Sequence, residues 1–337
     1  MTGIQFLCTI GPASHSAEVI QGLESQGATL LRINLSHTPI ERLASTIAEL
    51  RAWTRLPICL DTEGAQVRTG SSTGLRLQLG DLISLIGPNG HGIELTPAGI
   101  ADRLHLGDIL HLDFDGAVLR IEAGHEMEIL GRVITPGFVG ANKGVEVPRR
   151  LAAELPAFTP KDRAAIAIGL DLGISHFALS FANNGQSVRA FRDLLPSHAH
   201  VTAKIETMAA LHNAAEIAQE ADAVLVDRGD LSRQVPIALI PLAQRLVISR
   251  ASSVGKPTYI ATNLVETMIV SRQPTRAEAN DIYSCLEAGA QGLVLAAETA
   301  IGRNPVASLA FVKEVHVGWT AMCNGELEQL FAQTNEA

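Results

Sequence analysis

The sequence predicts an α/β protein whose main domain is a (β/α)8 TIM barrel, with a small all-β domain inserted after the third strand. Short apolar runs alternate with helical patterns, and eight strand–helix steps in about 240 residues match the arithmetic of this barrel. The segment 70–157 instead shows glycine-rich, alternating runs typical of antiparallel strands. The composition is 47% hydrophobic but only 4% aromatic, as expected for aliphatic parallel strands covered by helices. We therefore expect the barrel in residues 1–69 and 158–337 and a β-barrel-like lid in residues 70–157, with an open doubly wound sheet as the alternative.

Before the insertion, strands and helices follow one another in a simple alternation. Gly11 and Pro12 predict a turn after the first strand, with Ser14 as the candidate N-cap of the next helix. Gly27 is expected to end that helix. Strands are expected over residues 4–10, 29–35 and 57–60, and helices over residues 16–26 and 39–53.

After the insertion the same alternation resumes. Thr159 is expected to cap a helix that has Pro160 in its first turn. An Ala-rich pattern without Gly or Pro predicts a single helix over residues 207–221. Residues 319–337 are expected to extend the final helix and then fray. Strands are expected over residues 174–179, 200–203, 223–226, 258–261 and 292–296.

The overall charge and the cysteines exclude some classes of function. A formal net charge of −9 argues against a nucleic acid or an anionic membrane as partner, because both need a basic face. The four cysteines are scattered without a CxxC pair, which indicates reduced thiols and a cytoplasmic protein. We expect no signal peptide, and no apolar run approaches the ~20 residues of a membrane span. A homo-oligomer is left open.

Charged side chains follow two neighbouring strands of the predicted barrel. Lys204 and Glu206 come at the end of the fifth strand, and Arg228-Gly229-Asp230 follows the sixth. The carboxyl ends of parallel strands share one face, so these groups should converge on one pocket. The same face should hold the polar residues that follow the other strands: Arg32, Asn34, Ser36, His37, Asp61, Thr62, Arg68, Ser180, Thr262, Asn263, Glu298 and Thr299.

The chemistry of this set suits a metal and an anionic substrate. Glu206 and Asp230 are hard oxygen ligands of the kind that Mg²⁺ or Mn²⁺ prefers. Lys204 can stabilise an anion or move a proton, and the turn at Gly229 can open a helix whose N–H groups bind an anion. A second cluster of oxygen atoms could hold a monovalent cation or form only a hydrogen-bond network; it comprises Asn34, Ser36, Asp61 and Thr62.

Each of these residues also has a simpler explanation. The charged cluster could be a set of surface ion pairs, and Asp230, His37 or Thr262 could cap a helix. The spacing of Asp113 and Gly116 favours an ordinary hairpin turn. Arg68 and Lys143 could be solvated surface charges.

Several longer segments form a set that runs from Cys8 to about Pro305. They are CTIGPAS (8–14), RINLSH (32–37), LDTEGAQVRTG (60–70), KGVEVP (143–148), AKIET (203–207), DRGDL (227–231), GKP (255–257), ATNLVETM (261–268), PTRAE (274–278) and AETA (297–300). Together these segments resemble the pyruvate kinase family, and the set is far more specific than any single motif.

The resemblance implies a (β/α)8 barrel with an inserted β domain, and it assigns roles to individual residues. Catalytic roles fall to Lys204, Thr262 and Arg32. Mg²⁺ would be held by Glu206 and Asp230, and K⁺ by Asn34, Ser36, Asp61 and Thr62. Phosphoenolpyruvate or pyruvate would contact Ser180, Arg228, Gly229, Asp230 and Thr262. The phosphates of ADP or ATP would contact Pro12, Arg32, His37, Arg68, Asp113 and Lys143.

This sequence departs from the family pattern around the nucleotide and the phosphate. The family segment VARGDLG reads VDRGDLS here, so Asp227 adds a carboxylate beside the substrate loop. In the family segment DTKGPEIR, the Lys, Pro and Glu are replaced here by Glu63, Ala65 and Gln66. The Arg of the family segment SF-x-R is replaced by Asn183, and the Lys of SGETAKG is replaced by Ile301. The sequence ends about where the barrel ends, so we expect a short form without the family's C-terminal allosteric domain.

The leading hypothesis is a Mg²⁺-dependent phosphoryl transfer between phosphoenolpyruvate and ADP that gives pyruvate and ATP. The alternative is a related enzyme that uses a metal-bound pyruvate enolate: a 2-oxo acid lyase, aldolase or decarboxylase, or a phosphotransferase with another acceptor. The departures at Glu63, Asp227 and Ile301 favour this alternative. A non-catalytic binding protein is least favoured, because pure binding does not require the set Lys204, Glu206, Asp230 and Thr262.

Overall fold

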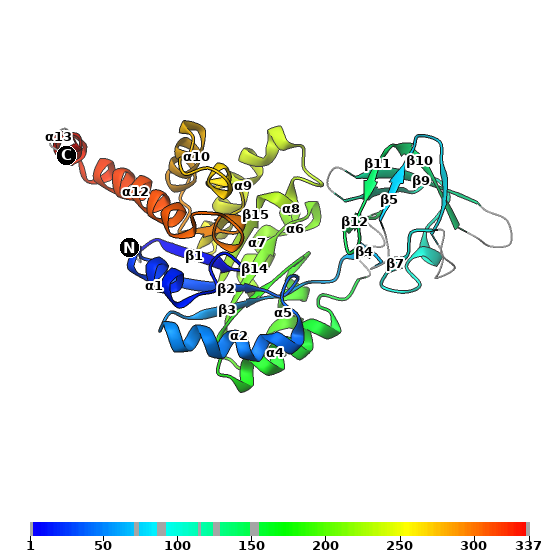
Figure 1. The fold of residues 1–337 in the computed structure, drawn as a ribbon, viewed down its shortest axis with the longest axis horizontal. Helices are drawn as coiled ribbons and strands as arrows, with labels where there is room; N and C mark the ends of the chain where they lie inside the picture. Colours follow the sequence, from blue (N-terminus) through cyan, green and yellow to red (C-terminus); the bar gives the residue numbers. More distant parts are fainter. Residues whose placement is uncertain are drawn as a thin grey trace. The chain divides into compact units, whose positions relative to one another are not determined.

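The chain forms two compact units, each described by itself below. The computed structural model describes residues 3–70, 74–85, 92–113, 116–123, 129–148 and 155–334. The first unit comprises Met1–Gly64 and Ala157–Ala337, and the second comprises Ala65–Pro156 (Figure 1). The division at Gly64 lies earlier than the expected boundary between residues 69 and 70, because β4 (Val67–Thr69) pairs with strands of the second unit.

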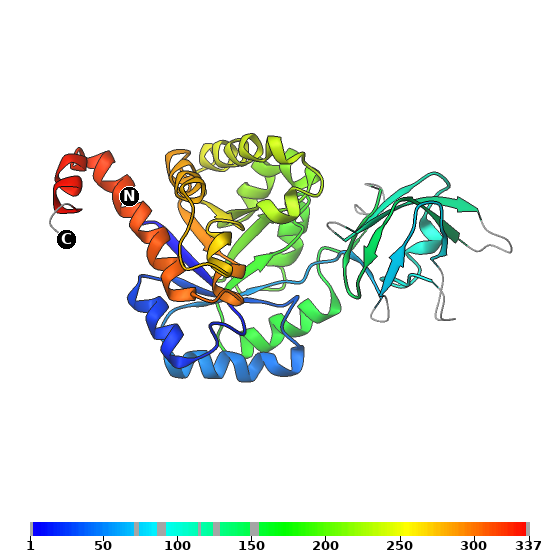
Figure 2. The ribbon, with the colours of Figure 1, turned by 45° about the horizontal axis from the view of Figure 1, so that its top comes forward.

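The first unit is a closed barrel of eight parallel strands, so the predicted (β/α)8 fold is confirmed. Neighbouring strands follow the order β1-β17-β16-β15-β14-β13-β3-β2. The central strands and the helices around them are seen in Figure 2. The strands are β1 (Gln5–Ile10), β2 (Leu30–Asn34), β3 (Ile58–Asp61), β13 (His176–Leu179), β14 (His200–Ile205), β15 (Ala223–Asp227), β16 (Thr258–Ala261) and β17 (Gly292–Leu295).

Helices cover the outside of the barrel and bury an aliphatic core against the strands. Burial of such apolar surface is worth roughly 25 cal/mol per Å² and is the main force that closes the barrel. The helices of this unit are α1 (Ala17–Ser25), α2 (Ile40–Trp53), α4 (Pro160–Asp171), α5 (Gly185–Arg192), α6 (Met208–His212), α7 (Ala214–Glu220), α8 (Arg228–Leu231), η2 (Ile237–Leu239), α9 (Ile240–Ser253), η3 (Glu266–Ile269), α10 (Arg276–Glu287), α11 (Ala297–Ala300), α12 (Pro305–Asn324) and α13 (Leu327–Thr334).

The helix starts confirm one predicted cap and correct another. Thr159 caps α4 in a capping box with Asp162, and Pro160 is the first helical residue, as predicted. The cap of α1 is Ser16, whose side chain accepts the N–H of Val19, and not Ser14. Ser14 is two residues too early: its hydroxyl instead accepts the N–H of Gly11 and closes the preceding turn.

The expected single helix over residues 207–221 is wrong in one respect, since α6 and α7 are separate helices. They meet at Asn213, whose backbone leaves helical geometry at ψ 14°. The Asn213 side chain donates to the carbonyl of Asn183 at 2.9 Å, and this long-range contact outweighs the local helical preference of the Ala-rich sequence.

At the other end of the chain, α12 stops at Gly325, which adopts the left-handed conformation with φ 77°, before α13 begins.

The second unit is built from short antiparallel strands around its own aliphatic core. Its seven-stranded sheet has the order β6-β10-β9-β8-β12-β4-β7, and β11 pairs with β5 separately. With β4 already given, its elements are β5 (Leu75–Leu77), β6 (Leu82–Ser84), β7 (Leu95–Thr96), η1 (Ala101–Arg103), β8 (Ile109–Leu112), β9 (Ala117–Ala123), β10 (Ile129–Thr135), β11 (Gly137–Val139) and β12 (Gly144–Glu146). In the described parts of both units, none of the helices has the length and apolar content required to cross a bilayer.

Candidate active site

Lys204 and Glu206 lie at the carboxyl end of β14 and face the barrel axis. Side chains alternate along a strand, and Ala203 and Ile205 pack into the outer core between strands and helices. Lys204 and Glu206 therefore point to the opposite side, where they are 4% and 1% exposed. A lysine and a glutamate at such depth need charged or hydrogen-bonding partners to offset the loss of water.

Lys204 finds those partners in three carboxylates from three strands. Its Nζ lies 2.6 Å from Glu206 Oε1, 3.2 Å from Asp227 Oδ2 and 3.4 Å from Asp61 Oδ2. It also donates to Ser180 Oγ at 3.3 Å. Burial alone would lower the pKa of Lys204, but the three carboxylates outweigh burial and raise the pKa above its ordinary value. Lys204 is therefore a fixed positive charge at the end of the barrel.

The two oxygens of Glu206 differ in their surroundings. Oε2 accepts the backbone N–H of Phe181 at 2.6 Å. Oε1 forms an ion pair with the Lys204 ammonium at 2.6 Å, and no other donor within the described residues reaches it. Burial and the nearby carboxylates Asp230 and Asp227 raise the pKa of Glu206 to about 8, against the opposing effect of Lys204. A divalent cation beside Oε1 would favour the ionised form of Glu206.

Three carboxylates come together where β14 and β15 end. Glu206, Asp227 and Asp230 each offer an oxygen, and these oxygens all lie within 4.8 Å of one another. Asp227 is the last residue of β15, and Asp230 lies in the short α8 that starts directly after it, which confirms the predicted helix opening at Arg228. Clustered carboxylate oxygens are the donors that Mg²⁺ and Mn²⁺ prefer, so the residues present fit a hard divalent cation.

Thr262 forms a strained turn directly after β16. Its φ of 68° lies in the left-handed region that a β-branched residue rarely adopts. Its hydroxyl accepts the Gly229 N–H at 2.9 Å and donates to the Ala261 carbonyl at 2.6 Å. This links the ends of β15 and β16, so Thr262 and the segment around Asp230 are held together.

Arg228 holds this turn in place through hydrogen bonds to its carbonyl groups. Its guanidinium donates to the carbonyls of Ala261 and Thr262 and forms a 2.7 Å ion pair with Asp281 of α10. The side-chain donors of Arg228, for which a substrate contact was expected, are thus directed at the protein. We infer that Arg228 positions Thr262.

Lys204 also contacts a buried network of hydrogen bonds and ion pairs, which is formed by Arg32, Asp61 and Ser180. Arg32 pairs with the Asp61 carboxylate through Nε at 2.7 Å and through its NH2 group, and it donates to Thr9 Oγ1 at 2.8 Å. Ser180 Oγ donates to the Thr62 carbonyl at 2.8 Å. The network places the guanidinium of Arg32 and the ammonium of Lys204 on the same Asp61 oxygen.

The residues expected around K⁺ lie at the ends of the adjacent strands β2 and β3. Asn34 is paired in register with Asp61. The Asn34 side-chain oxygen accepts the Ser36 N–H at 3.0 Å, and Thr62 Oγ1 accepts the Ser180 N–H at 2.9 Å. The four residues are thus neighbours, but most of their described oxygens already have hydrogen-bond partners. His37 continues the same turn, with its N–H donating to the Asn34 carbonyl at 3.2 Å.

The other residues expected near a nucleotide belong to two different units. Pro12 lies exposed in the turn after β1 of the barrel unit. In the second unit, Lys143 forms an ion pair with Asp113 at 3.3 Å, and Arg68 donates to the Asn142 carbonyl at 3.1 Å. Asp113 has φ 61°, in keeping with the predicted hairpin turn.

Glu298 has a role that the sequence did not reveal. It is 1% exposed, and its carboxylate accepts the N–H groups of Leu264, Val265 and Ala296 at 3.1, 3.3 and 2.8 Å. It therefore anchors the segment that continues from Thr262. The only signal in the sequence was its position after the eighth strand, which does not distinguish a support from a ligand.

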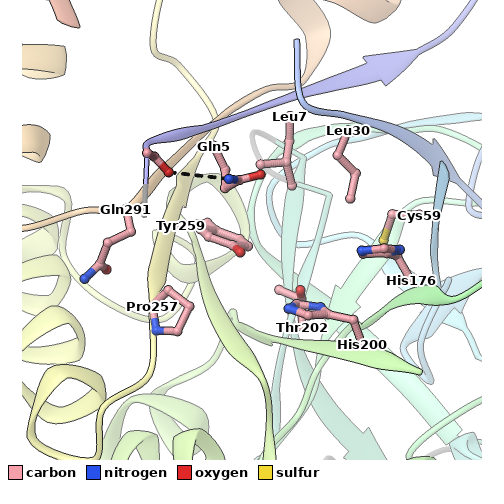
Figure 3. Close-up of a pocket in the computed structure, with 11 residues that line it drawn as sticks. Gln5, Leu7, Leu30, Cys59, His176, His200, Thr202, Pro257, Tyr259 and Gln291 are labelled. Carbon is pink, nitrogen blue, oxygen red and sulfur yellow. Dashed lines mark hydrogen bonds between the residues drawn. The ribbon is translucent and has the colours of Figure 1, made fainter. Parts of the chain in front are cut away.

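A separate pocket lies at the amino ends of the strands (Figure 3). It has a volume of about 330 Å³, and its walls include Cys59, Thr202 and Tyr259. The rings of His176 and His200 stack in it with centroids 5.3 Å apart. Each of these histidines is the first residue of its strand, whereas Lys204 lies near the opposite end of β14. This pocket is thus distinct from the carboxylate cluster.

Comparisons with known proteins agree with this arrangement. A family model described as the barrel domain of pyruvate kinase matches residues 1–309. Similar curated proteins named pyruvate kinase come from Aeropyrum pernix (32% identity, 93% of this chain and 70% of the relative), Geobacillus stearothermophilus (34%, 93% and 55%) and Thermoplasma acidophilum (31%, 92% and 57%). The chain thus spans between 55% and 70% of the length of these relatives.

Proposed function

The chain belongs to the pyruvate kinase family, and on that premise we propose that it transfers a phosphoryl group between phosphoenolpyruvate and ADP to give pyruvate and ATP. The transfer would depend on Mg²⁺ or Mn²⁺. In-line phosphoryl transfer needs positioning and charge neutralisation more than covalent chemistry by the protein. The described site is suited to both tasks.

The observation that carries this proposal is the position of Lys204 beside Glu206. A permanent ammonium lies 2.6 Å from a buried carboxylate oxygen that no other donor among the described residues reaches. Asp230 supplies a second carboxylate within 4.8 Å. A site of this kind binds a divalent cation and an anion next to each other.

Each of these residues would have a distinct role in the reaction. Lys204 stabilises negative charge on the transferred group and on the oxygen that it leaves. Arg32, held by Asp61, adds a second fixed positive charge. The hydroxyl of Thr262 moves a proton to or from the carbon of the enol. When bound at Glu206 and Asp230, the divalent cation supplies charge that polarises the substrate oxygens.

K⁺ and the nucleotide complete the proposed reaction. K⁺ would lie at Asn34, Ser36, Asp61 and Thr62, which the fold brings to adjacent strand ends. Nucleotide phosphates would meet Arg32 and His37 of the barrel unit; Arg68, Asp113 and Lys143, which the family resemblance also assigns to the nucleotide, belong to the inserted unit. Phosphoenolpyruvate would contact Ser180, Thr262 and the backbone at Gly229 and Asp230.

The buried carboxylate of Asp227 favours a second candidate. It lies 3.2 Å from Lys204 Nζ, so it adds negative charge where a phosphorylated acid would bind. A 2-oxo acid lyase, aldolase or decarboxylase acts on a substrate with less negative charge. Such an enzyme would use Lys204 and the carboxylates but would not need the nucleotide residues.

One assay separates the two candidates. The protein is mixed with Mg²⁺, K⁺ and phosphoenolpyruvate, with and without ADP, and pyruvate and ATP are both measured. We expect equal amounts of pyruvate and ATP, formed only when ADP is present. Absence of ATP, together with metal-dependent exchange of pyruvate methyl protons in D₂O, would instead establish the second candidate.

A further inference from the structure

Asp227 differs from the rest of the site because the family pattern has no carboxylate at this position. The family segment VARGDLG reads VDRGDLS in this chain. Asp227 is the last residue of β15 and is 5% exposed. It follows Ala223 and Leu225 along the same face of the strand, and both of these pack inside the barrel. Its side chain therefore points along the barrel axis toward Lys204.

Pairing with Lys204 alone does not account for a carboxylate at this depth. Asp61 and Glu206 already lie within 3.4 Å of the same ammonium. Arg32 also pairs with Asp61, so two cations face the three carboxylates, and one negative charge remains that neither cation neutralises. A buried charge without compensation is costly. A cation in contact with Asp227 would remove that cost.

Asp227 also lies close to two other carboxylates, those of Glu206 and Asp230. Its carboxylate oxygen lies within 4.8 Å of an oxygen of Glu206 and of Asp230, so three carboxylates surround one point. Small side-chain rotations bring such oxygens to the spacing of ligands on an ion with bonds of about 2.1 Å. Glu206 Oε1, which is buried and is reached by no donor among the described residues other than Lys204, belongs to the same group.

We propose that Asp227 is a third protein ligand of the divalent cation, so that this chain holds its metal before any substrate binds. A site with two carboxylates depends on substrate oxygens to complete the coordination of the ion. A site with three has a higher affinity, because metal affinity rises with the number of charged ligands. This inference rests on the proposed function only for the presence of a divalent cation at the barrel mouth.

The test is a titration of the protein with Mn²⁺ alone, followed by the EPR signal of the free ion, in a buffer without organic acid, phosphate or nucleotide. The variants are Asp227→Asn, Asp227→Ala, Glu206→Gln and Asp61→Asn. Asp61→Asn is the matched control: it removes a carboxylate that is 3.4 Å from the same ammonium but is not in the group of three. Asp171→Asn is a second control: it removes one negative charge at the exposed last residue of α4, which is not part of the site.

We expect both Asp227 variants to weaken Mn²⁺ binding by about tenfold or more, and by at least about fivefold more than Asp61→Asn. Glu206→Gln should weaken binding as well, and Asp171→Asn should bind like the unaltered protein. Unchanged affinity in the Asp227 variants would overturn the proposal, as would unchanged affinity in Glu206→Gln. An equal loss of Mn²⁺ affinity in Asp61→Asn would also overturn the proposal, because Asp227 would then act on the ion only through its charge and not as a ligand.

A measurement on the unaltered protein covers the case in which the Asp227 variants do not fold. Broadening of the Mn²⁺ signal in water enriched in ¹⁷O counts the water ligands on the bound ion. Three protein ligands leave about three waters on a six-coordinate ion, whereas two leave about four. Three waters support the proposal, and four contradict it. Because no substrate is present, these results stand whether or not phosphoenolpyruvate and ADP react.

Discussion

Lys204 Nζ lies 2.6 Å from Glu206 Oε1, where Lys204 belongs to β14 and Glu206 directly follows the last residue of that strand. This contact is possible because alternate side chains of β14 share the face that looks into the barrel. The same pairing places a permanent positive charge beside a carboxylate whose pKa burial raises to about 8.

Replacement of Lys204 by Ala should abolish turnover, with a fall in kcat of at least about 10³-fold, because the site would lose the one positive charge that contacts Glu206, Asp227 and Asp61 together within the described residues. Lys204→Arg should retain more activity than Lys204→Ala. The assay is steady-state formation of pyruvate and ATP, with circular dichroism as the check on folding. Lys256→Ala is the control, since Lys256 binds the Ala221 carbonyl at the amino side of β15 and β16. Activity of Lys204→Ala within twofold (about 0.4 kcal/mol) of the unaltered protein would refute the proposed mechanism.

Thr262→Ala should lower kcat by about 10² to 10⁴-fold if its hydroxyl moves the proton at the enol carbon. Thr262→Ser keeps the hydroxyl that accepts the Gly229 N–H and should retain most of the activity. Proton exchange into pyruvate, measured by NMR in D₂O, reports this step separately from phosphoryl transfer. A variant Thr262→Ala that exchanges protons as fast as Thr262→Ser would exclude the hydroxyl from the step.

Glu298→Ala should destabilise the protein, because three backbone N–H groups around a buried carboxylate would lose their acceptor. The expected loss in the free energy of unfolding is about 3 kcal/mol, and Glu298→Gln should lose less because its amide oxygen can still accept. Urea unfolding followed by circular dichroism measures both. Glu287→Ala, at the end of α10, serves as the control on another glutamate. Equal stability of Glu298→Ala and the control would mean that these hydrogen bonds contribute nothing.

The histidine pair in the pocket at the amino ends of the strands should make stability depend on pH. Burial lowers the pKa of both His176 and His200, and each is lowered further by nearby positive groups, although Asp222 partly opposes this at His200. The unfolded chain, with a histidine pKa of about 6.5, therefore binds protons before the folded chain does. Stability from this pair is fully present above pH ~6.5 and is lost as the pH falls through the lower pKa of the folded state.

Urea unfolding at pH 7.5 and at pH 5.5 tests this expectation. The double variant His176→Gln with His200→Gln should show a smaller loss of stability between these two values than the unaltered protein. Burial raises the pKa of the other titratable groups in the pocket, Cys59 and Tyr259, so they do not change charge in this interval. The same pH slope in both proteins would show that the histidines are not responsible.

Much of the fold was predictable because the relevant signals are local. Apolar runs and helical periodicity located the eight strands of the barrel to within a few residues, and β16 was predicted with the bounds that the structure shows. The N-cap at Thr159 was equally readable, since a cap depends on residues close together in the sequence. The break at Asn213 was not, because it depends on a contact with Asn183, thirty positions away.

The sequence by itself determined which residues stand at the strand ends, and hence that Lys204, Glu206 and Asp230 would share one face of the barrel. Only the tertiary structure decided what each side chain does there. It turned Arg228 toward Asp281 and the Thr262 turn, made Glu298 an anchor for backbone N–H groups, and placed Asp227 beside Glu206 and Asp230. The reason is physical: strand ends follow from local patterns, whereas the direction of a buried charged side chain is set by partners that parallel pairing brings from distant parts of the chain.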